Sequence, residues 1–484
     1  MVNGFDHLQS RCRGRVVAPG DPDYESLRAV WNGSIQRRPA AILQCAGIAD
    51  VLAGVRFAAD RELPLAVRAG GHNIAGLGTC DGGLVLDLRA LQGVRIDPRT
   101  RRARVQTGIT WGTFDHEAQA FGLATTGGIM STTGVAGFTL GGGVGWLVRR
   151  HGSASDNLRS VDLVTADGEL TVVDGESEPE LLWALRGGGG NFGVATSLEF
   201  ELHDVGPEVV AGSVVYPLEQ AAEVLEAWAA ALPSLPDDAM TIATLRTAPQ
   251  DPPFPEQLWG LPVLSVSMMW LGAREEADAA LAPLRTLGRP AVDAVGPKQY
   301  TAVQKAQDPY WSPGALNYWK ADYLRGLDRE AIATLVDAAA QFSSPASDIK
   351  LAALGGALAR VPEDTSAYGH RDAAILLNIN TRWNEPTAES THIEWTRELW
   401  GELHRLAVGV YVNFLGDEGG GRIVQAYGED KYRRLVEVKR RWDPQNLFRI
   451  NQNIPPGGDA WTGGEAFPRT HTTVTARKRR ESSV

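Results

Sequence analysis

The sequence predicts an α+β protein with two main domains. Its 484 residues suggest two or three domains at a typical size of about 150 residues each. Strand-like and helix-like segments follow one another without the regular alternation of a doubly wound parallel sheet. The 54 glycines cluster, above all in a stretch from 118 to 148 that has no charged side chain. Such a stretch indicates backbone that packs closely against a flat, bulky partner.

The composition excludes several classes of protein. The 47 basic and 58 acidic residues give a net charge of −11, which argues against nucleic acid as a partner because phosphate contacts need positive charge. The segment 118–148 has too much glycine, threonine and serine for a membrane-spanning helix. Only three cysteines occur, without a Cys-x-x-Cys pair, and no histidine cluster has ligand spacing, so no metal site is expected. The first residues show no apolar signal region, and we expect a cytoplasmic protein.

The first part of the chain alternates short apolar strands with helices. Apolar residues recur at helical spacing in 48–61, and 111–121 also has helical character. Asp167-Gly168 is a typical hairpin turn. Strands are predicted at 63–67, 84–88, 103–107, 161–165, 170–173 and 194–202, and a further helix at 178–186. Together these elements form the predicted first domain, residues 1–205.

The pattern changes near Val205-Gly206-Pro207. The segments 214–216, 241–245 and 261–270 are predicted strands, and 221–232 and 274–287 are predicted helices between them. We therefore expect a second domain, 206–409, with a sheet covered by helices. The segment 410–456 returns to glycine loops and asparagines and is expected to pack back on the first domain. The composition of 457–484 is typical of a disordered tail.

Two glycine motifs have different meanings. The loop Arg68 to Asn73 lies between predicted strands, and its successive amides can form an anion-binding nest beside Arg68. It lacks the Lys-Ser/Thr pair of a phosphate-binding P-loop, and by this loop alone His72 fits an ordinary polar loop residue slightly better. Gly188-x-Gly190-x-x-Gly193 matches the dinucleotide-binding fingerprint as a string. It follows a helix and precedes a strand, the reverse of what an NAD site requires.

The block from Gly127 to Gly145 is the strongest single signal. Eight of its nineteen positions are glycine. Each glycine costs chain entropy on folding, so a purely structural loop has no need of so many. A surface that lies flat against a diphosphate and an aromatic ring does need them.

Five ordered segments carry a family resemblance. They are PLAVRAGGHN, STTGVAGFTLGGGVGWL, SDNLRSVDLVTADG, GGGGNFGV and DPQNLFRINQNIPP, within a match over about residues 35–456. In this order and spacing they resemble the FAD-linked oxidases of the berberine bridge enzyme group, in the vanillyl-alcohol oxidase superfamily. The resemblance implies a PCMH-type FAD-binding domain of two subdomains and a substrate domain with an antiparallel sheet covered by helices.

The resemblance also implies roles on the cofactor side. His72 matches the residue whose imidazole is covalently joined to the flavin. Many members have a second bond from a cysteine, but Met130 stands at that position and Cys45 and Cys80 are off-register, so no second link is expected. Thr133 matches a position that helps control oxygen access. The remaining implied cofactor contacts are Arg68, Ala69, Gly70, Gly71, Asn73, Thr133, Gly134, Gly137, Thr139, Leu140, Gly141, Gly142, Asp156, Asn157, Val194, Asn451 and Asn453.

Three residues are candidates on the substrate side. Tyr411 begins a Tyr-Val-Asn-Phe segment that resembles a family motif whose tyrosine deprotonates or positions the substrate. An ordinary tyrosine pKa is near about 10, so a base at neutral pH would need positive charge nearby, and a buried structural tyrosine is the alternative. Along the predicted strand 373–383, alternation places Asn378 and Asn380 on one face. These amides can orient a substrate but cannot take its proton.

The expected activity is oxidation of a small organic substrate by FAD, with O2 reduced to H2O2. The substrate would be a secondary metabolite, an alcohol, an amine or a sugar, and the sequence of 206–409 does not indicate which. Two alternatives stay open. One is a dehydrogenase of the same fold that uses another acceptor, and the other is a flavin-dependent oxygenase of secondary metabolism. The oligomeric state is also left open.

Overall fold

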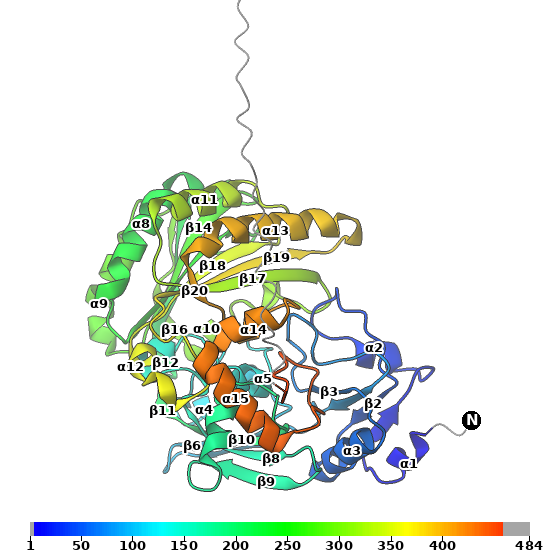
Figure 1. Cartoon of the computed structure of the whole chain (residues 1–484). Helices are drawn as coiled ribbons and strands as arrows, with labels where there is room; N and C mark the ends of the chain where they lie inside the picture. Colours follow the sequence, from blue (N-terminus) through cyan, green and yellow to red (C-terminus); the bar gives the residue numbers. More distant parts are fainter. Residues whose placement is uncertain (1–3, 458–484) are drawn as a thin grey trace, which may run out of the picture.

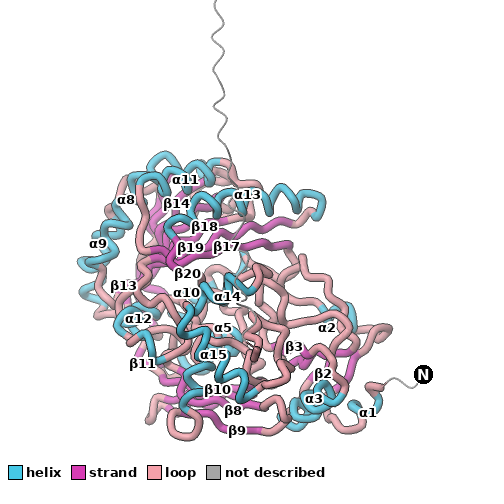
Figure 2. Tube along the Cα trace, viewed as in Figure 1, coloured by secondary structure: helices cyan, strands magenta, loops and turns pink. Residues whose placement is uncertain are grey.

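The structure is a computed structural model that describes residues 4–457. Within these residues the chain forms four β-sheets, and the largest lies at one end of the molecule with helices on its outer side (Figure 1). Long loops fill much of the space between this sheet and the sheets of the first half (Figure 2). Parallel and antiparallel pairs occur together with separate helical layers, which confirms the α+β class.

The N-terminal sheet carries the first cofactor-binding candidate. Its strand order is β1-β2-β4-β3, with β2, β4 and β3 parallel. Helix α3 (Ile48–Asp60) buries Val51 and Val55 against this sheet, as their helical spacing predicts. Because β3 ends at Arg68, the loop that contains His72 leaves the carboxyl edge of the parallel strands. The other elements here are α1 (Asp6–Gln9), β1 (Arg15–Val17), α2 (Tyr24–Arg28), β2 (Ala41–Gln44), β3 (Leu65–Arg68) and β4 (Leu84–Asp87).

The second sheet is antiparallel, with the order β5-β6-β10-β8-β9. The predicted hairpin is confirmed: β8 pairs with β9 around Gly168, whose φ of 69° favours glycine. The uncharged stretch 118–148 contains short helices joined by loops. The elements are β5 (Val94–Asp97), β6 (Arg102–Gln106), α4 (Trp111–Gln119), β7 (Leu123–Ala124), α5 (Val135–Leu140), α6 (Val148–His151), β8 (Leu158–Val164), β9 (Leu170–Asp174), α7 (Pro179–Leu185), β10 (Val194–Glu201) and β11 (His203–Asp204), of which β7 and β11 form a separate pair.

The largest sheet has nine antiparallel strands in the order β15-β12-β14-β13-β18-β19-β17-β20, with β16 also paired to β12. Its strands are β12 (Glu208–Pro217), β13 (Ala239–Thr247), β14 (Pro262–Trp270), β15 (Val292–Asp293), β16 (Gly296–Gln299), β17 (Leu316–Leu324), β18 (Asp348–Ala353), β19 (Ile375–Trp383) and β20 (Ala407–Gly409). Strand β12 is much longer than the predicted 214–216, and β17 and β18 are additional strands that the pattern did not indicate.

Helices cover one face of this sheet, and the other face is turned toward the glycine-rich loops (Figure 1). Apolar side chains such as Trp228, Leu335 and Leu399 fill the outer layer. Met240, Ile242 and Leu376 on the inner face share a cluster with residues 146–148 of the first half. The principal outer helices are α8 (Ala221–Ala231), α9 (Ala277–Arg285), α11 (Arg329–Ala340) and α13 (Glu389–Leu403), and the shorter α10 (Tyr300–Lys305) and α12 (Ala357–Arg360) lie between strands.

The C-terminal segment returns to the first half of the chain. Leu435 and Val436 of α15 (Glu429–Trp442), which follows α14 (Gly420–Tyr427), are buried in the same cluster as β6, β8 and β10. Lys439 is fully buried and donates hydrogen bonds to the backbone oxygens of Asn191 and Phe448 and to Asp443. The expected domain boundaries stay predictions, and the predicted disordered tail lies almost wholly outside the described residues.

Across residues 4–457, no helix is both long and apolar enough to cross a membrane. The cytoplasmic location stays a prediction.

Candidate active site

A cavity of about 340 Å³ lies where the glycine-rich loops meet the inner face of the large sheet. One wall is built from the loop after β3 and from parts of 128–145 and 188–195. The opposite wall is the sheet itself, and the segments 412–414 and 448–452 close one side. Two halves of the chain that are far apart in sequence therefore form one site.

The first wall is largely bare backbone. A Cβ added to Gly137 or Gly190 would meet no atom within 4 Å, so it would project into open space. Gly70 and Gly134 have a different role, because a Cβ on either would come within 2.6 Å of the other's backbone. Glycine at these two positions lets two loops touch. A long surface of exposed amides without side chains fits a diphosphate and a flat ring system, which is the shape of FAD.

His72 stands at this wall. Its Nε2 lies 3.1 Å from the hydroxyl of Thr132, and its ring stacks on Trp31 with 5.0 Å between ring centroids and 22° between planes. Burial lowers the pKa of His72 to about 4 because the charged form loses hydration. The imidazole is therefore neutral at physiological pH, and with Nε2 engaged by Thr132, Nδ1 is the nitrogen left for another bond.

The positions of Met130, Cys45 and Cys80 bear on how many covalent links a flavin could have. Met130 lines the cavity, and it stands at the position where the resemblance implies a cysteine in many relatives. Cys45 and Cys80 are buried in the N-terminal sheet and do not line the cavity. Burial raises the pKa of Cys80 to about 11, so its thiol stays protonated at neutral pH.

Fourteen predicted site residues line the cavity and seven do not. Those at the cavity are Arg68, Ala69, Gly70, Gly71, His72, Asn73, Thr133, Gly134, Gly137, Leu140, Gly141, Asn378, Asn380 and Asn451. Those outside its lining are Thr139, Gly142, Asp156, Asn157, Val194, Asn453 and Tyr411. All of 68–73 line the cavity, whereas in 139–142 only Leu140 and Gly141 do and Thr139 and Gly142 face away from it.

Arg68 does not offer a free positive charge to the cavity. Its guanidinium is 1% exposed and forms an ion pair of 2.8 Å with Asp87, which also pairs with Arg89. A Cβ added to Gly71 would lie 3.5 Å from Cδ of Arg68, so the Arg68 side chain packs against this glycine. Arg68 therefore packs under the loop with its charge already paired, so that the anion binding we expect of this loop would rest on the loop amides.

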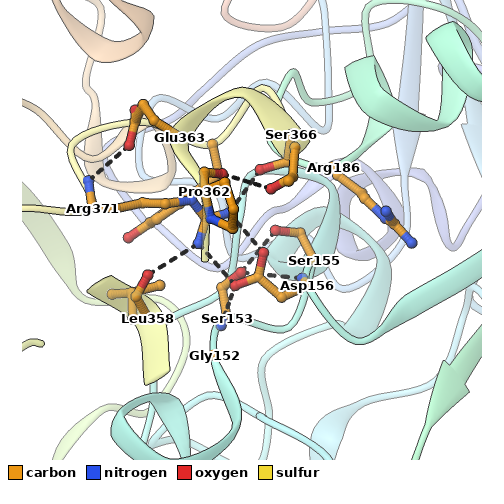
Figure 3. A network of polar contacts seen from close by, with 12 residues as sticks. Gly152, Ser153, Ser155, Asp156, Arg186, Leu358, Pro362, Glu363, Ser366 and Arg371 are labelled. Atoms are coloured by element: carbon orange, nitrogen blue, oxygen red, sulfur yellow. Dashed lines mark hydrogen bonds and ion pairs between the residues drawn. The ribbon is translucent and has the colours of Figure 1, made fainter. Parts of the chain in front are cut away.

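Asp156 and Asn157 form hydrogen bonds that hold neighbouring segments of the chain together. Figure 3 shows the Asp156 carboxylate against Arg371, with distances of 2.7 and 3.0 Å to the guanidinium, and close to the Ser153 amide. Arg371 also donates to Ser366, so this network joins the loop after α6 to the chain that leads into β19 (Figure 3). Asn157 donates to the backbone oxygens of His151 and Ser153.

The other residues outside the lining are also held by packing. Gly142 has a φ of +115°, and a Cβ there would lie 2.4 Å from the Tyr368 ring. Val194 is buried at the start of β10, and the hydroxyl of Thr139 has no hydrogen-bond partner among the described residues.

Tyr411 lies behind the cavity wall, contrary to the expectation that its hydroxyl reaches a substrate. This hydroxyl oxygen accepts hydrogen bonds from the backbone amides of Gly143 and Val144 at 2.9 and 3.2 Å and from Asn413 at 2.8 Å. Burial raises the pKa of Tyr411 to about 12 despite these donors. The contacts match the structural alternative, and the role of Tyr411 as a base stays a prediction.

The sheet wall contains a charged residue that the motifs did not indicate. Lys350 on β18 lines the cavity directly opposite Asn378 in the register of β18 and β19. It pairs with Asp348, which also accepts a 2.7 Å hydrogen bond from Asn380. A sequence signal for Lys350 did exist. Asp348 and Lys350 are two positions apart in the otherwise apolar segment 348–353, and this spacing places both side chains on the same face of a strand.

Among residues 4–457, no group of three or more His, Cys, Asp or Glu side chains is placed to hold a metal ion.

Comparison with known protein families gives two matches. A family described as an FAD-binding domain matches residues 39–174, and one described as berberine and berberine-like matches 410–455. The (R)-6-hydroxynicotine oxidase of Paenarthrobacter nicotinovorans is 33% identical over 467 residues, covering 92% of this chain and 97% of that protein. The xylooligosaccharide oxidase of Thermothelomyces thermophilus is 26% identical, covering 93% and 94%.

Solved structures show the same relationship. The crystal structure of 6-hydroxy-D-nicotine oxidase from Arthrobacter nicotinovorans has a TM-score of 0.84 and 30% identity, covering 92% of this chain and 98% of that one. A grass pollen allergen with glucose dehydrogenase activity, Phl p 4, shares the fold with a TM-score of 0.81 at 21% identity. These likenesses confirm the expected fold. The chain is a member of the berberine bridge enzyme-like family of FAD-linked oxidoreductases.

Proposed function

We propose that this protein is an oxidase that holds FAD covalently through His72 and oxidises a small organic substrate, with O2 as the acceptor and H2O2 as the product. The cavity with two unlike walls is the observation that best supports this. A flat cofactor against the glycine wall would leave its other side open toward the side chains of the sheet. A substrate between them would lie face to face with the cofactor.

We assign the cofactor contacts to the glycine wall. The loops 68–73, 133–141 and 188–191 would hold FAD through backbone amides, with Nδ1 of His72 as the point of attachment. Bound FAD would accept two electrons from the substrate and pass them to the acceptor. Thr133 lies on this wall, where a small side chain leaves room for O2.

The sheet wall would bind and orient the substrate. Met240, Ile242, Ala352 and Leu376 make it mainly apolar and exclude water. Among the cavity-lining residues of the described chain there is no aspartate or glutamate. Lys350 is the titratable side chain on this wall, and Asn378 and Asn380 supply its amides.

Oxygen consumption tests this proposal directly. The purified holoenzyme is screened with alcohols, amines, phenols and sugars, and O2 loss is compared with H2O2 formed. Equal amounts support an oxidase. Flavin reduction that needs an artificial acceptor for turnover would instead show a dehydrogenase, and label from isotopic O2 in the organic product would show an oxygenase.

A further inference from the structure

One segment of the second half of the chain, residues 308–317, contacts the residues that hold His72. It begins with the short 3₁₀ helix η5 (Asp308–Tyr310) and ends at the start of β17. It forms hydrogen bonds to Ser131 in the glycine-rich block and to residues 31–33 of the N-terminal part. The surroundings of His72 therefore depend on a segment more than two hundred positions later in the sequence.

Asp308 fixes the residue that precedes Thr132. Its carboxylate accepts a hydrogen bond from the backbone amide of Ser131 at 2.9 Å and another from the Ser131 hydroxyl at 2.5 Å. Hydrogen bonds to an ionised group are roughly twice as strong as neutral ones. Ser131 is 8% exposed, and the next residue, Thr132, places its hydroxyl beside Nε2 of His72. Asp308 thus holds the stretch of chain from which Thr132 reaches the imidazole.

Trp31, which stacks on the His72 ring, is held by the same segment. Its indole Nε1 donates to the backbone oxygen of Trp311 at 3.1 Å, and its own backbone oxygen accepts from the Gly314 amide at 3.0 Å. The two tryptophan rings are stacked, with 6.3 Å between centroids and 22° between planes. The Trp31 amide in turn donates to the backbone oxygen of Gly71 at 3.0 Å. Trp31 therefore connects the 308–317 segment to the loop of His72.

Asn32 makes a third connection on the other side of the loop. Its Nδ2 donates to the backbone oxygens of Ile74 at 2.9 Å and of Asn317 at 3.1 Å, and its Oδ1 accepts from the Asn317 amide at 3.1 Å. Asn32 is 2% exposed, so these bonds are shielded from water. The residues before, beside and after His72 are thus all tied to one segment of the second half.

We propose that the 308–317 segment positions His72 for attachment to FAD, with Asp308 as a positioning residue that acts through Ser131 and Thr132. Attachment forms a bond between Nδ1 and a flavin methyl carbon and releases one proton from the imidazole and one from the methyl group. The electron pair of the broken C–H bond goes to the flavin ring, and O2 takes it up with two protons as H2O2. This inference rests on the proposed function, because it takes His72 as the attachment point.

The rate of attachment tests the role of Asp308. Full-length protein is prepared from riboflavin-limited cells, FAD is added, and the flavin that resists denaturation is followed by fluorescence of the protein band. Asp308→Ala removes both acceptors, and we expect attachment about 10- to 100-fold slower, with non-covalent FAD binding kept by the glycine wall. Asp308→Asn can still pair with the amide and the hydroxyl of Ser131 and should attach flavin at close to the wild-type rate. Asp337→Ala, at an exposed aspartate on α11, is the matched control and should attach flavin like the wild type.

A double-variant cycle separates positioning from general destabilisation. Thr132→Val breaks the connection between Asp308 and His72, and we expect it to slow attachment by itself. Because Asp308 acts through Thr132, the double variant D308A/T132V should be no slower than T132V. Losses that multiply in the double variant would show that Asp308 only stabilises the fold and would overturn the proposal. Ser131→Ala removes the hydroxyl contact at the other end, takes the place of D308A should that variant not fold, and is also expected to slow attachment.

Attachment in D308A at the wild-type rate would overturn the role of Asp308 and leave the proposed function intact. A wild type that loses all its flavin on denaturation would contradict the histidyl link, and the positioning role with it. The oxidase reaction is judged separately, by O2 consumption of the same preparations. Attachment that depends on Asp308 in a protein that consumes no O2 on turnover supports the positioning role and contradicts the oxidase.

Discussion

The Thr132 hydroxyl lies 3.1 Å from Nε2 of His72, while Trp31 stacks on the same imidazole. The first contact occupies one ring nitrogen, and the second fixes the plane of the ring. The ring is therefore held in one orientation, with Nδ1 as the nitrogen that is not bonded to Thr132. Two residues outside the GGH motif thus position the histidine that we assign to cofactor attachment.

This contact predicts that Thr132→Val lowers the fraction of FAD that is covalently bound, because the imidazole loses the hydrogen bond that fixes its tautomer. Flavin fluorescence of the protein band after denaturing electrophoresis measures this fraction. Thr132→Ser keeps the hydroxyl and should restore it. Equal covalent fractions in the valine and serine variants would show that Thr132 has no part in attachment.

A single covalent bond through His72 is expected, because Met130 replaces the second attachment residue and Cys80 lies away from the cavity. The tryptic peptide 69–89 contains both His72 and Cys80, so fragment-ion mass spectrometry is needed to place the flavin. We expect His72→Ala to retain FAD non-covalently through the backbone contacts, and Cys80→Ser to keep the bond. Flavin mass on any cysteine would contradict a single histidyl link.

Tyr411→Phe distinguishes a structural from a catalytic tyrosine. Removing the hydroxyl leaves the amides of Gly143 and Val144 without their acceptor, and an unpaired buried donor costs about 1–3 kcal/mol. The structure therefore leads us to expect a loss of unfolding free energy of that order, measured by denaturant titration, with a modest effect on anaerobic flavin reduction. A general base would give the opposite result: about 10²- to 10⁴-fold slower reduction at unchanged stability.

Asp115 predicts a pH dependence of stability. Burial raises the pKa of this carboxyl to about 7, with a partly opposing hydrogen bond from Gln304. Below about pH 4 both the folded and the unfolded chain hold the proton. As the pH rises toward 7 the unfolded state releases it while the folded state keeps it, so stability falls by an amount of the order of 4 kcal/mol.

Asp115→Asn removes this titration and keeps the shape. Thermal unfolding should show the variant more stable than the wild type above pH 7 and little changed near pH 4. Parallel stability curves for the two proteins across this range would show that Asp115 ionises normally in the folded state.

Much of the fold followed from the sequence by itself. Helix α3, the hairpin at Gly168 and the strand with Asn378 and Asn380 all have local patterns whose period matches their structure. The glycine loops could also be assigned, because glycine at a close approach is required by the backbone itself, while the role of His72 rests on the family resemblance and stays a prediction. These features depend on neighbours within a few residues, and the sequence shows those neighbours directly.

Only the tertiary structure decided which side chains reach the cavity. Asp156, which we expect at the cofactor, lies outside the cavity lining and pairs with Arg371, more than two hundred positions later. Tyr411 turns its hydroxyl to the 143–144 amides, and Lys350 joins the substrate wall through the pairing of β18 with β19. Each outcome depends on a partner distant in sequence, because a buried polar group takes the nearest complementary group in space. The sequence therefore determined the family and the glycine wall and indicated the histidine that we propose as the attachment point, while long-range packing decided the charges and hydrogen bonds at the sheet side of the cavity.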